Sequence, residues 1–396
     1  LTAMAILKLR SLPALALLVI PLLNFAQTMQ TADTKATKRT RALFYNLQQM
    51  ALSGKTLFGH EDAVAYGIGW QKVEGASDVK TISGSHPAVY GWDLGEIGAR
   101  PINIDTVDFE DMKRWTREAY KRGGVHTISW HMRNPLTGGD SWDTTSAVKT
   151  ILPGGSRHEF FKTQLDHVAE YMGALKSKGL FGHAIPVIFR PWHEMNGRWF
   201  WWGRTHCTPE EYKALFRFTV DYLRHEKDLH NILFAYAPDV CASAEEYLLY
   251  YPGDDYADLM GIDIYEFQNR PVAAMADLIG MVVELAEARG KIPAFTETGF
   301  EGIPKSDWWT NGLLNPIKKH PLANRIAYLL VWRNARENHC FAPYPGHPSE
   351  RNFLDFVNDP NILLENDLPD MYRMPKKAKG GTAPVPAITK ADSINQ

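Results

Sequence analysis

The sequence predicts a single-domain α/β fold, a (β/α)8 or TIM barrel, from three observations. Eight short apolar runs, rich in β-branched residues, have the length of buried strands. Amphipathic stretches with helical periodicity lie between these runs. Charged and aromatic residues follow the runs directly, and in a barrel all such positions meet on the face where the active sites of this fold lie. In a doubly wound open sheet, the main rival, they would be spread along an edge.

The predicted strands and helices alternate along the chain. The strand runs are residues 56–59, 88–92, 125–130, 185–189, 231–235, 259–264, 292–295 and 327–331. The helical stretches include residues 108–121, 158–176, 208–227, 272–289 and 308–319. Thr208 and Pro209 form a strong helix start, because hydroxyl side chains cap helices and proline suits the first helical position. Gly290 predicts a helix end.

The two ends of the chain differ in composition from the middle. An apolar run over residues 12–25 has the length of a signal-peptide core and is short for a membrane span. We therefore expect residues 1–26 to be a signal peptide, with a retained membrane anchor as the rival, and the protein to be secreted or periplasmic. Residues 27–38 are expected to be a flexible lead-in, residues 39–370 the barrel, and residues 371–396 a disordered tail.

Composition limits the partners. The 43 basic and 45 acidic residues nearly balance, which gives no reason to expect nucleic acid or a polybasic membrane contact. Aromatic residues make up 12% of the chain, which fits a carbohydrate-facing groove, although large cores also use them. Cys207, Cys241 and Cys340 allow at most one disulfide and match no zinc motif. We expect a monomer without stable membrane insertion, metal or cofactor.

The most informative stretch covers residues 185–202, IPVIFRPWHEMNGRWFWW. An apolar strand runs there into Arg190, His193 and Glu194, and tryptophans follow. A sugar-binding cleft combines such residues, because pyranose rings stack apolar faces on indoles and their hydroxyls need charged or amide partners. In the alternative interpretation, Glu194 pairs with Arg190 and the tryptophans belong to the core.

A second carboxylate, Glu297, ends the seventh strand in PAFTETGF. Acids at the fourth and seventh strands of a barrel can flank one bond, and glycoside hydrolysis needs one acid to protonate the leaving oxygen and a second carboxylate to attack or to activate water. Carboxyl groups about 5–5.5 Å apart give retention, and a gap of about 6.5–9.5 Å gives inversion. The indoles near Glu194 predict a raised pKa. In the alternative, Glu297 is a salt-bridge partner of Arg333.

Six motifs carry a family resemblance. They are FGHED (58–62), SWH (129–131), RPWHEMNG (190–197), GIDIY (261–265), FTETGF (295–300) and VWRN (331–334). Together they resemble glycoside hydrolase family 26 of clan A, dominated by β-1,4-mannanases, over residues 39–356. The resemblance implies that Glu194 is the general acid/base and Glu297 the nucleophile, with net retention.

The resemblance also implies the residues that bind substrate. Those expected at the cleaved sugar are His131, His193, Trp199, Tyr265 and Trp332, with Tyr265 hydrogen-bonded to the nucleophile. His60 and Arg333 are expected to reach sugars further toward the non-reducing end. Trp142, in the long segment 132–156 after the third strand, is a further expected platform for a sugar.

The predicted function is cleavage of β-1,4-mannosidic bonds in mannan, galactomannan or manno-oligosaccharides by double displacement. A β-1,3-xylanase or mixed-linkage glucanase of the same family, and a non-catalytic carbohydrate-binding barrel, are the alternatives. A metal-dependent amidohydrolase would need a His-x-His pair where this chain has His60, Glu61 and Asp62. The sequence leaves open whether the cleft is open at both ends, since segment 132–156 could close one of them.

Overall fold

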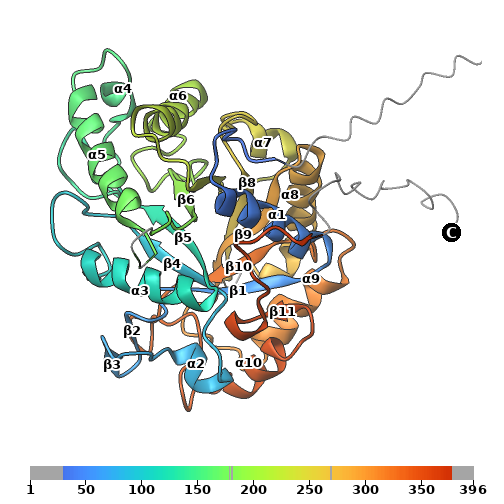
Figure 1. Cartoon of the computed structure of the whole chain (residues 1–396). Coiled ribbons are helices and arrows are strands. Elements are labelled where there is room, and N and C mark those ends of the chain that lie inside the picture. Colours follow the sequence, from blue (N-terminus) through green and yellow to red (C-terminus); the bar gives the residue numbers. More distant parts are fainter. Residues whose placement is uncertain (1–29, 178, 180–181, 268–269, 377–396) are drawn as a thin grey trace, which may run out of the picture. The chain divides into compact units, whose positions relative to one another are not determined.

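The computed structural model describes residues 30–177, 179, 182–267 and 270–376. Eight parallel strands close there into a barrel and follow one another around the ring in sequence order (Figure 1). They are β1 (Thr56–Glu61), β4 (Val89–Asp93), β5 (Val125–Trp130), β6 (Val187–Pro191), β7 (Ile232–Tyr236), β8 (Leu259–Tyr265), β9 (Ile292–Gly299) and β10 (Tyr328–Val331). Pairing of β10 with β1, from Leu57 opposite Tyr328 to His60 opposite Val331, closes the ring. The predicted barrel is confirmed, and an open sheet is excluded.

The predicted helices surround the barrel. They correspond to α3 (Phe109–Arg122), α5 (His158–Ala174), α6 (Pro209–Asp221) continued by the π-helix η1 (Tyr222–Glu226), the 3₁₀-helix η2 (Val272–Met275) with α8 (Ala276–Ala288), and the π-helix η3 (Trp308–Leu314) with α9 (Asn315–Lys319). Thr208 caps α6 as predicted, because its side chain accepts a hydrogen bond from the Glu211 N–H at 3.2 Å. Local sequence signals therefore placed these helices well.

Several elements were not predicted. They are α1 (Lys38–Leu52), the hairpin of β2 (Tyr66–Gly67) and β3 (Trp70–Gln71), α2 (Asp78–Ser83), α4 (Val148–Ile151), α7 (Ala244–Leu248), α10 (Glu350–Val357), β11 (Ile362–Leu363) and the 3₁₀-helix η4 (Glu365–Asp367). Helix α1 buries Leu43, Leu47 and Ala51 in one apolar cluster. The same cluster contains Leu57, near the start of β1, and Ile292, at the start of β9. It therefore covers the end of the barrel where the strands begin.

Both segments that flank the barrel are packed where the structure describes them. The Ala32 N–H donates to Asp258 Oδ1 at 2.7 Å, and Asp33 Oδ2 lies 2.7 Å from His230 Nδ1. At the other end, Asn46 Nδ2 donates to the Met371 carbonyl at 2.9 Å, and Met371 is fully buried. Residues 32, 33 and 371 therefore pack against the rest of the described chain, and the flexible lead-in and disordered tail stay predictions. The predicted signal peptide and the tail beyond residue 376 lie outside the described residues.

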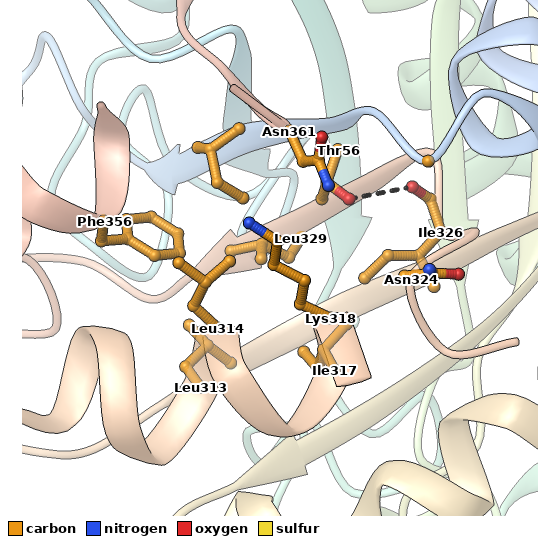
Figure 2. Close-up of a pocket in the computed structure, with 12 residues that line it drawn as sticks. Thr56, Leu313, Leu314, Ile317, Lys318, Asn324, Ile326, Leu329, Phe356 and Asn361 are labelled. Atoms are coloured by element: carbon orange, nitrogen blue, oxygen red, sulfur yellow. Dashed lines mark hydrogen bonds between the residues drawn. The ribbon is translucent and has the colours of Figure 1, made fainter. Parts of the chain in front are cut away.

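A small apolar pocket lies between α9 and the amino ends of β1 and β10 (Figure 2). Thr56 Oγ1 donates to the Ile326 carbonyl beside it at 3.3 Å, and Leu313, Leu314 and Ile317 line it. Its volume of about 20 Å³ holds roughly one water molecule, so it is a packing gap. None of the helices in the described part of the chain is long and apolar enough to cross a membrane.

Candidate active site

A cleft of about 420 Å³ opens at the other end of the barrel, where the strands end. It is lined by His131, Trp142, His193, Glu194, Trp199, Phe200, Asp239, Tyr265, Phe267, Arg270, Glu297, Trp332 and Phe341. Both predicted carboxylates are among these residues, as is every residue predicted to bind substrate except His60 and Arg333. The convergence of strand ends that the sequence predicted is thus present in space.

Glu297 is held at both carboxylate oxygens. Arg190, on β6, donates from Nη2 to Glu297 Oε1, and the Tyr265 hydroxyl donates to Oε2 at 2.8 Å. Glu297 lies within β9, and the residue is 4% exposed. Two donors on fixed strands orient this carboxylate toward the cleft, as a nucleophile requires. Glu297 pairs with Arg190 rather than with Arg333, so the alternative salt bridge is wrong.

A third carboxylate, Asp263 on β8, lies beside Glu297 and was missed by the sequence reasoning. It accepts hydrogen bonds from Arg190 Nη1 at 2.8 Å and from Thr296 Oγ1 at 2.6 Å. Arg190 is therefore shared between two buried acids, and it is itself 1% exposed. The strand period gave a signal, because Asp263 precedes Tyr265 by two residues and so points to the same side of its strand.

Glu194 follows β6 in an irregular turn. Trp192 and Glu194 have positive φ values of 56° and 54°, and the Glu194 N–H donates to the Ala237 carbonyl at 2.7 Å. Trp199 Nε1 donates to Glu194 Oε2 at 2.6 Å. This turn directs the Glu194 side chain into the cleft and places one indole N–H on its carboxyl group, so the alternative pairing of Glu194 with Arg190 is wrong.

Burial in the cleft raises the pKa of Glu194 well above its usual value, and the charges of Asp263, Glu297 and Asp239 raise it further. The Trp199 hydrogen bond acts in the opposite direction. The direction agrees with the prediction. Three of the tryptophans in this stretch are fully buried and pack on one another: Trp192, Trp201 and Trp202. They belong to the core, as the alternative interpretation held.

The acids are close together. One carboxylate oxygen from each of Glu194, Asp263 and Glu297 lies within 4.8 Å of the other two. Retaining glycosidases place their two carboxyl groups about 5–5.5 Å apart, whereas inverting enzymes need about 6.5–9.5 Å to admit a water molecule. An oxygen–oxygen separation of at most 4.8 Å fits the closer, retaining arrangement.

The wall at β5 is built on a buried contact between a histidine and a carboxylate. His131 Nδ1 lies 2.7 Å from Asp93 Oδ2, and Trp142 stacks on the His131 ring with centroids 5.3 Å apart and planes 16° apart. Burial lowers the pKa of His131, but the Asp93 carboxylate outweighs this and the net change is upward. The centroid of the His193 ring lies 4.7 Å from that of His131. Burial lowers the pKa of His193 well below its usual value, and Arg190 and His131 lower it further. The pKa values of the two imidazoles at the cleft are therefore shifted in opposite directions.

Trp142 reaches this wall from segment 132–156. Asn134 organises the segment, since its Nδ2 donates to the carbonyls of Asp143 and Thr145 at 3.0 and 2.8 Å. Trp142 is 50% exposed. A half-exposed indole on a hydrogen-bonded loop at the cleft is suited to stack on a sugar.

His60 and Arg333 do not line this cleft. His60 is 1% exposed, and burial lowers its pKa to about 3. Arg333 forms an ion pair with Asp105 at 2.8 Å and donates to the Tyr66 hydroxyl at 3.2 Å. Five lining residues, in turn, were not predicted: Phe200, Asp239, Phe267, Arg270 and Phe341. They lie in loops where no sequence period marks the side that faces the cleft.

Comparisons with known proteins agree with this geometry. Residues 32–312 match the glycosyl hydrolase family 26 profile. A mannan endo-1,4-beta-mannosidase of Bifidobacterium adolescentis is 34% identical over 391 residues, and the match covers 92% of this chain but 38% of that protein. The enzyme of the same name from Bacillus subtilis is 30% identical over 268 residues, covering 64% of this chain and 68% of the relative.

Solved structures of mannanases are also similar to this chain. A GH26 beta-mannanase from Bacteroides ovatus superimposes with a TM-score of 0.81 at 44% identity, covering 85% of this chain and 98% of that one. An endo-beta-1,4-mannanase from Cellulomonas fimi has a TM-score of 0.79 at 36% identity, covering 87% and 79%. With the profile matched over most of the chain and the acids in place, the chain belongs to glycosyl hydrolase family 26.

Proposed function

We propose that this protein hydrolyses internal β-1,4-mannosidic bonds of mannan, galactomannan and manno-oligosaccharides with net retention. The observation that carries the proposal is the pair of carboxylates in one cleft with oxygens within 4.8 Å, Glu297 held by two donors and Glu194 with a raised pKa. The choice of mannan is supported by relatives that are named mannan endo-1,4-beta-mannosidases.

In the first step, protonated Glu194 donates its proton to the glycosidic oxygen while a Glu297 oxygen attacks the anomeric carbon. The carbon–oxygen bond to the leaving sugar breaks and an ester bond to Glu297 forms. Arg190 and Tyr265 keep the attacking carboxylate in position throughout. In the second step, the Glu194 carboxylate takes a proton from water, the water oxygen attacks the same carbon, and the ester bond breaks. Two inversions give retention.

The geometry also explains how Glu194 changes role. The negative charge of Glu297 raises the pKa of Glu194 in the free enzyme. Once Glu297 is an ester it carries no charge, so this contribution disappears and Glu194 ionises more readily. The same carboxyl group is therefore an acid before the first step and a base before the second.

Mannan is a polysaccharide too large to enter a cell intact. We therefore further propose that residues 1–26 direct export of the protein and are removed. The apolar run after Lys8 and Arg10 supports this proposal, as does its short length. Amino-terminal sequencing of protein recovered from the culture medium tests it: a start near residue 27 is expected, and an intact amino terminus in the membrane fraction would favour an anchor.

The substrate is tested by product analysis over time on mannohexaose, galactomannan and mixed-linkage β-glucan. We expect early release of several oligosaccharide lengths from mannan, and little product from β-glucan. Glu194→Gln, which keeps the side-chain shape but cannot donate the same proton, is the matched control and should lose this activity. Faster cleavage of β-glucan or β-1,3-xylan than of mannan would overturn the substrate assignment, and binding without turnover on every glycan would indicate a non-catalytic barrel.

A further inference from the structure

The two acids divide the mouth of the barrel into two parts. Glu194 follows β6 and Glu297 lies on β9, so one arc of the ring consists of β10, β1, β4 and β5 and the other of β7 and β8 (Figure 1). His131 and Trp332 lie on the first arc, where the attacked sugar binds in the proposed function. A bond held between the acids has a sugar on each side, so the leaving-group sugars lie over the second arc.

The second arc carries lining residues that the mechanism above does not use. Phe267 follows β8 and is 53% exposed, although it is a large apolar side chain. The Arg270 guanidinium lies over its ring at 4.9 Å from the centroid. Arg270 Nε is buried and has no hydrogen-bond partner among the described residues. An exposed ring beside an unsatisfied donor, both at a sugar cleft, is the combination that binds a pyranose.

The pair is held in place by its own backbone and by Glu266. The N–H groups of Phe267 and Arg270 each donate to the carbonyl of the other, at 3.2 and 3.1 Å. Glu266, next to Phe267, is itself held, because its Oε2 accepts from the Val272 N–H at 2.9 Å and from Trp308 Nε1 at 3.0 Å. A platform ordered before substrate arrives loses less entropy on binding.

Asp239, after β7, adds a carboxylate to the same arc. Asn196 fixes it next to the Glu194 turn: Asn196 Oδ1 accepts from the Asp239 N–H at 2.8 Å, and Asn196 Nδ2 donates to the Asp239 carbonyl at 2.8 Å. The arc therefore offers an aromatic face, a cation and an anion. That set suits a neutral sugar, whose hydroxyls both donate and accept hydrogen bonds.

We propose that Phe267 and Arg270, with Asp239, form the binding site for the leaving-group sugars of the mannan chain. This inference rests on the proposed function. Phe267 stacks on the apolar face of a pyranose, and Arg270 and Asp239 bind its hydroxyls. The site makes the enzyme favour substrates that extend to the reducing-end side of the cleaved bond.

The test compares two substrates in Phe267→Ala. Mannohexaose has leaving-group sugars, whereas an aryl β-mannobioside has a phenol there. We expect kcat/KM on mannohexaose to fall about tenfold, equivalent to about 1.4 kcal/mol. On the aryl substrate it should change less than about twofold, which is under 0.5 kcal/mol. Hydrolysis of mannohexaose in ¹⁸O water should also show cleavage moving toward the reducing end, because the other subsites then dominate binding.

Phe160→Ala is the matched control, since Phe160 is 42% exposed on α5 and does not line the cleft. This variant should leave kcat/KM unchanged on both substrates. Arg270→Ala should lower kcat/KM on mannohexaose more than on the aryl substrate, as Phe267→Ala does. Equal loss on both substrates, or an unchanged cleavage pattern in both cleft variants, would overturn the inference while leaving the function intact. A wild-type protein that cleaves no mannan at all would overturn the function and this site together.

Discussion

Replacing Trp199 with phenylalanine tests how the site sets the acidity of Glu194. The Trp199 indole N–H donates to Glu194 Oε2 at 2.6 Å, and this bond favours the ionised carboxylate. Removing it raises the pKa of Glu194 further. Because Glu194 must be protonated to act as an acid, the basic limb of the pH profile of kcat/KM should move to higher pH.

The size of the shift follows from the bond. Hydrogen bonds to charged groups contribute about 1.5–3 kcal/mol, and the Trp199 side chain is 37% exposed, so we take the lower end reduced by solvent to about 1 kcal/mol. One pKa unit corresponds to about 1.4 kcal/mol, so the expected increase is roughly 0.7 unit. The assay is kcat/KM of mannohexaose, whose leaving sugar needs the proton of Glu194, measured from roughly pH 4 to pH 9.

Trp142→Phe is the control for this experiment. Trp142 lines the same cleft, and among the described residues it makes no hydrogen bond to Glu194. Both variants should lose some activity through weaker sugar stacking, but only Trp199→Phe should move the basic limb. A basic limb that stays in place in Trp199→Phe, or moves to lower pH, would refute the reasoning.

Three further changes test the stability of the barrel. Arg190→Met leaves Asp263 and Glu297 buried without their cation and should lower the free energy of unfolding by about 3–5 kcal/mol in urea titrations; a loss under about 1 kcal/mol contradicts this. Thr208→Ala removes the α6 cap and should cost about 1 kcal/mol in the same assay. Gly173→Ala should stabilise α5 by about 0.5 kcal/mol, because the new methyl group meets only Leu229 at 3.7 Å, and destabilisation would contradict the packing there.

The sequence predicted the barrel well because every strand is buried and apolar. It missed α1, although Leu43, Leu47 and Ala51 recur at helical spacing, because polar residues precede that helix and the lead-in was expected to be flexible. The apolar run at residues 292–295 also predicted a seventh strand that ends at residue 295. The strand in fact continues through Glu297 to Gly299, and an irregular register with β8 places Asp263 opposite Glu297.

Sequence patterns were weakest where the chain is irregular. In the turn after β6 there is no fixed period, so the sequence could not show that Trp199 faces the cleft while Trp201 and Trp202 face the core. The same limit hid Phe267 and Arg270, which follow β8 in a loop. Composition alone gives residue types there, and only tertiary packing decides which of them meet the substrate.

The most direct test of the central claim is azide rescue of Glu194→Ala and Glu297→Ala with an aryl β-mannobioside. In Glu194→Ala, azide attacks the Glu297 ester from the face that water uses, so the account predicts a β-mannosyl azide. In Glu297→Ala, azide occupies the space of the missing nucleophile and attacks the substrate itself, so an α-mannosyl azide is predicted. The reverse assignment of the two products, read by NMR of the anomeric proton, would contradict the roles given to Glu194 and Glu297.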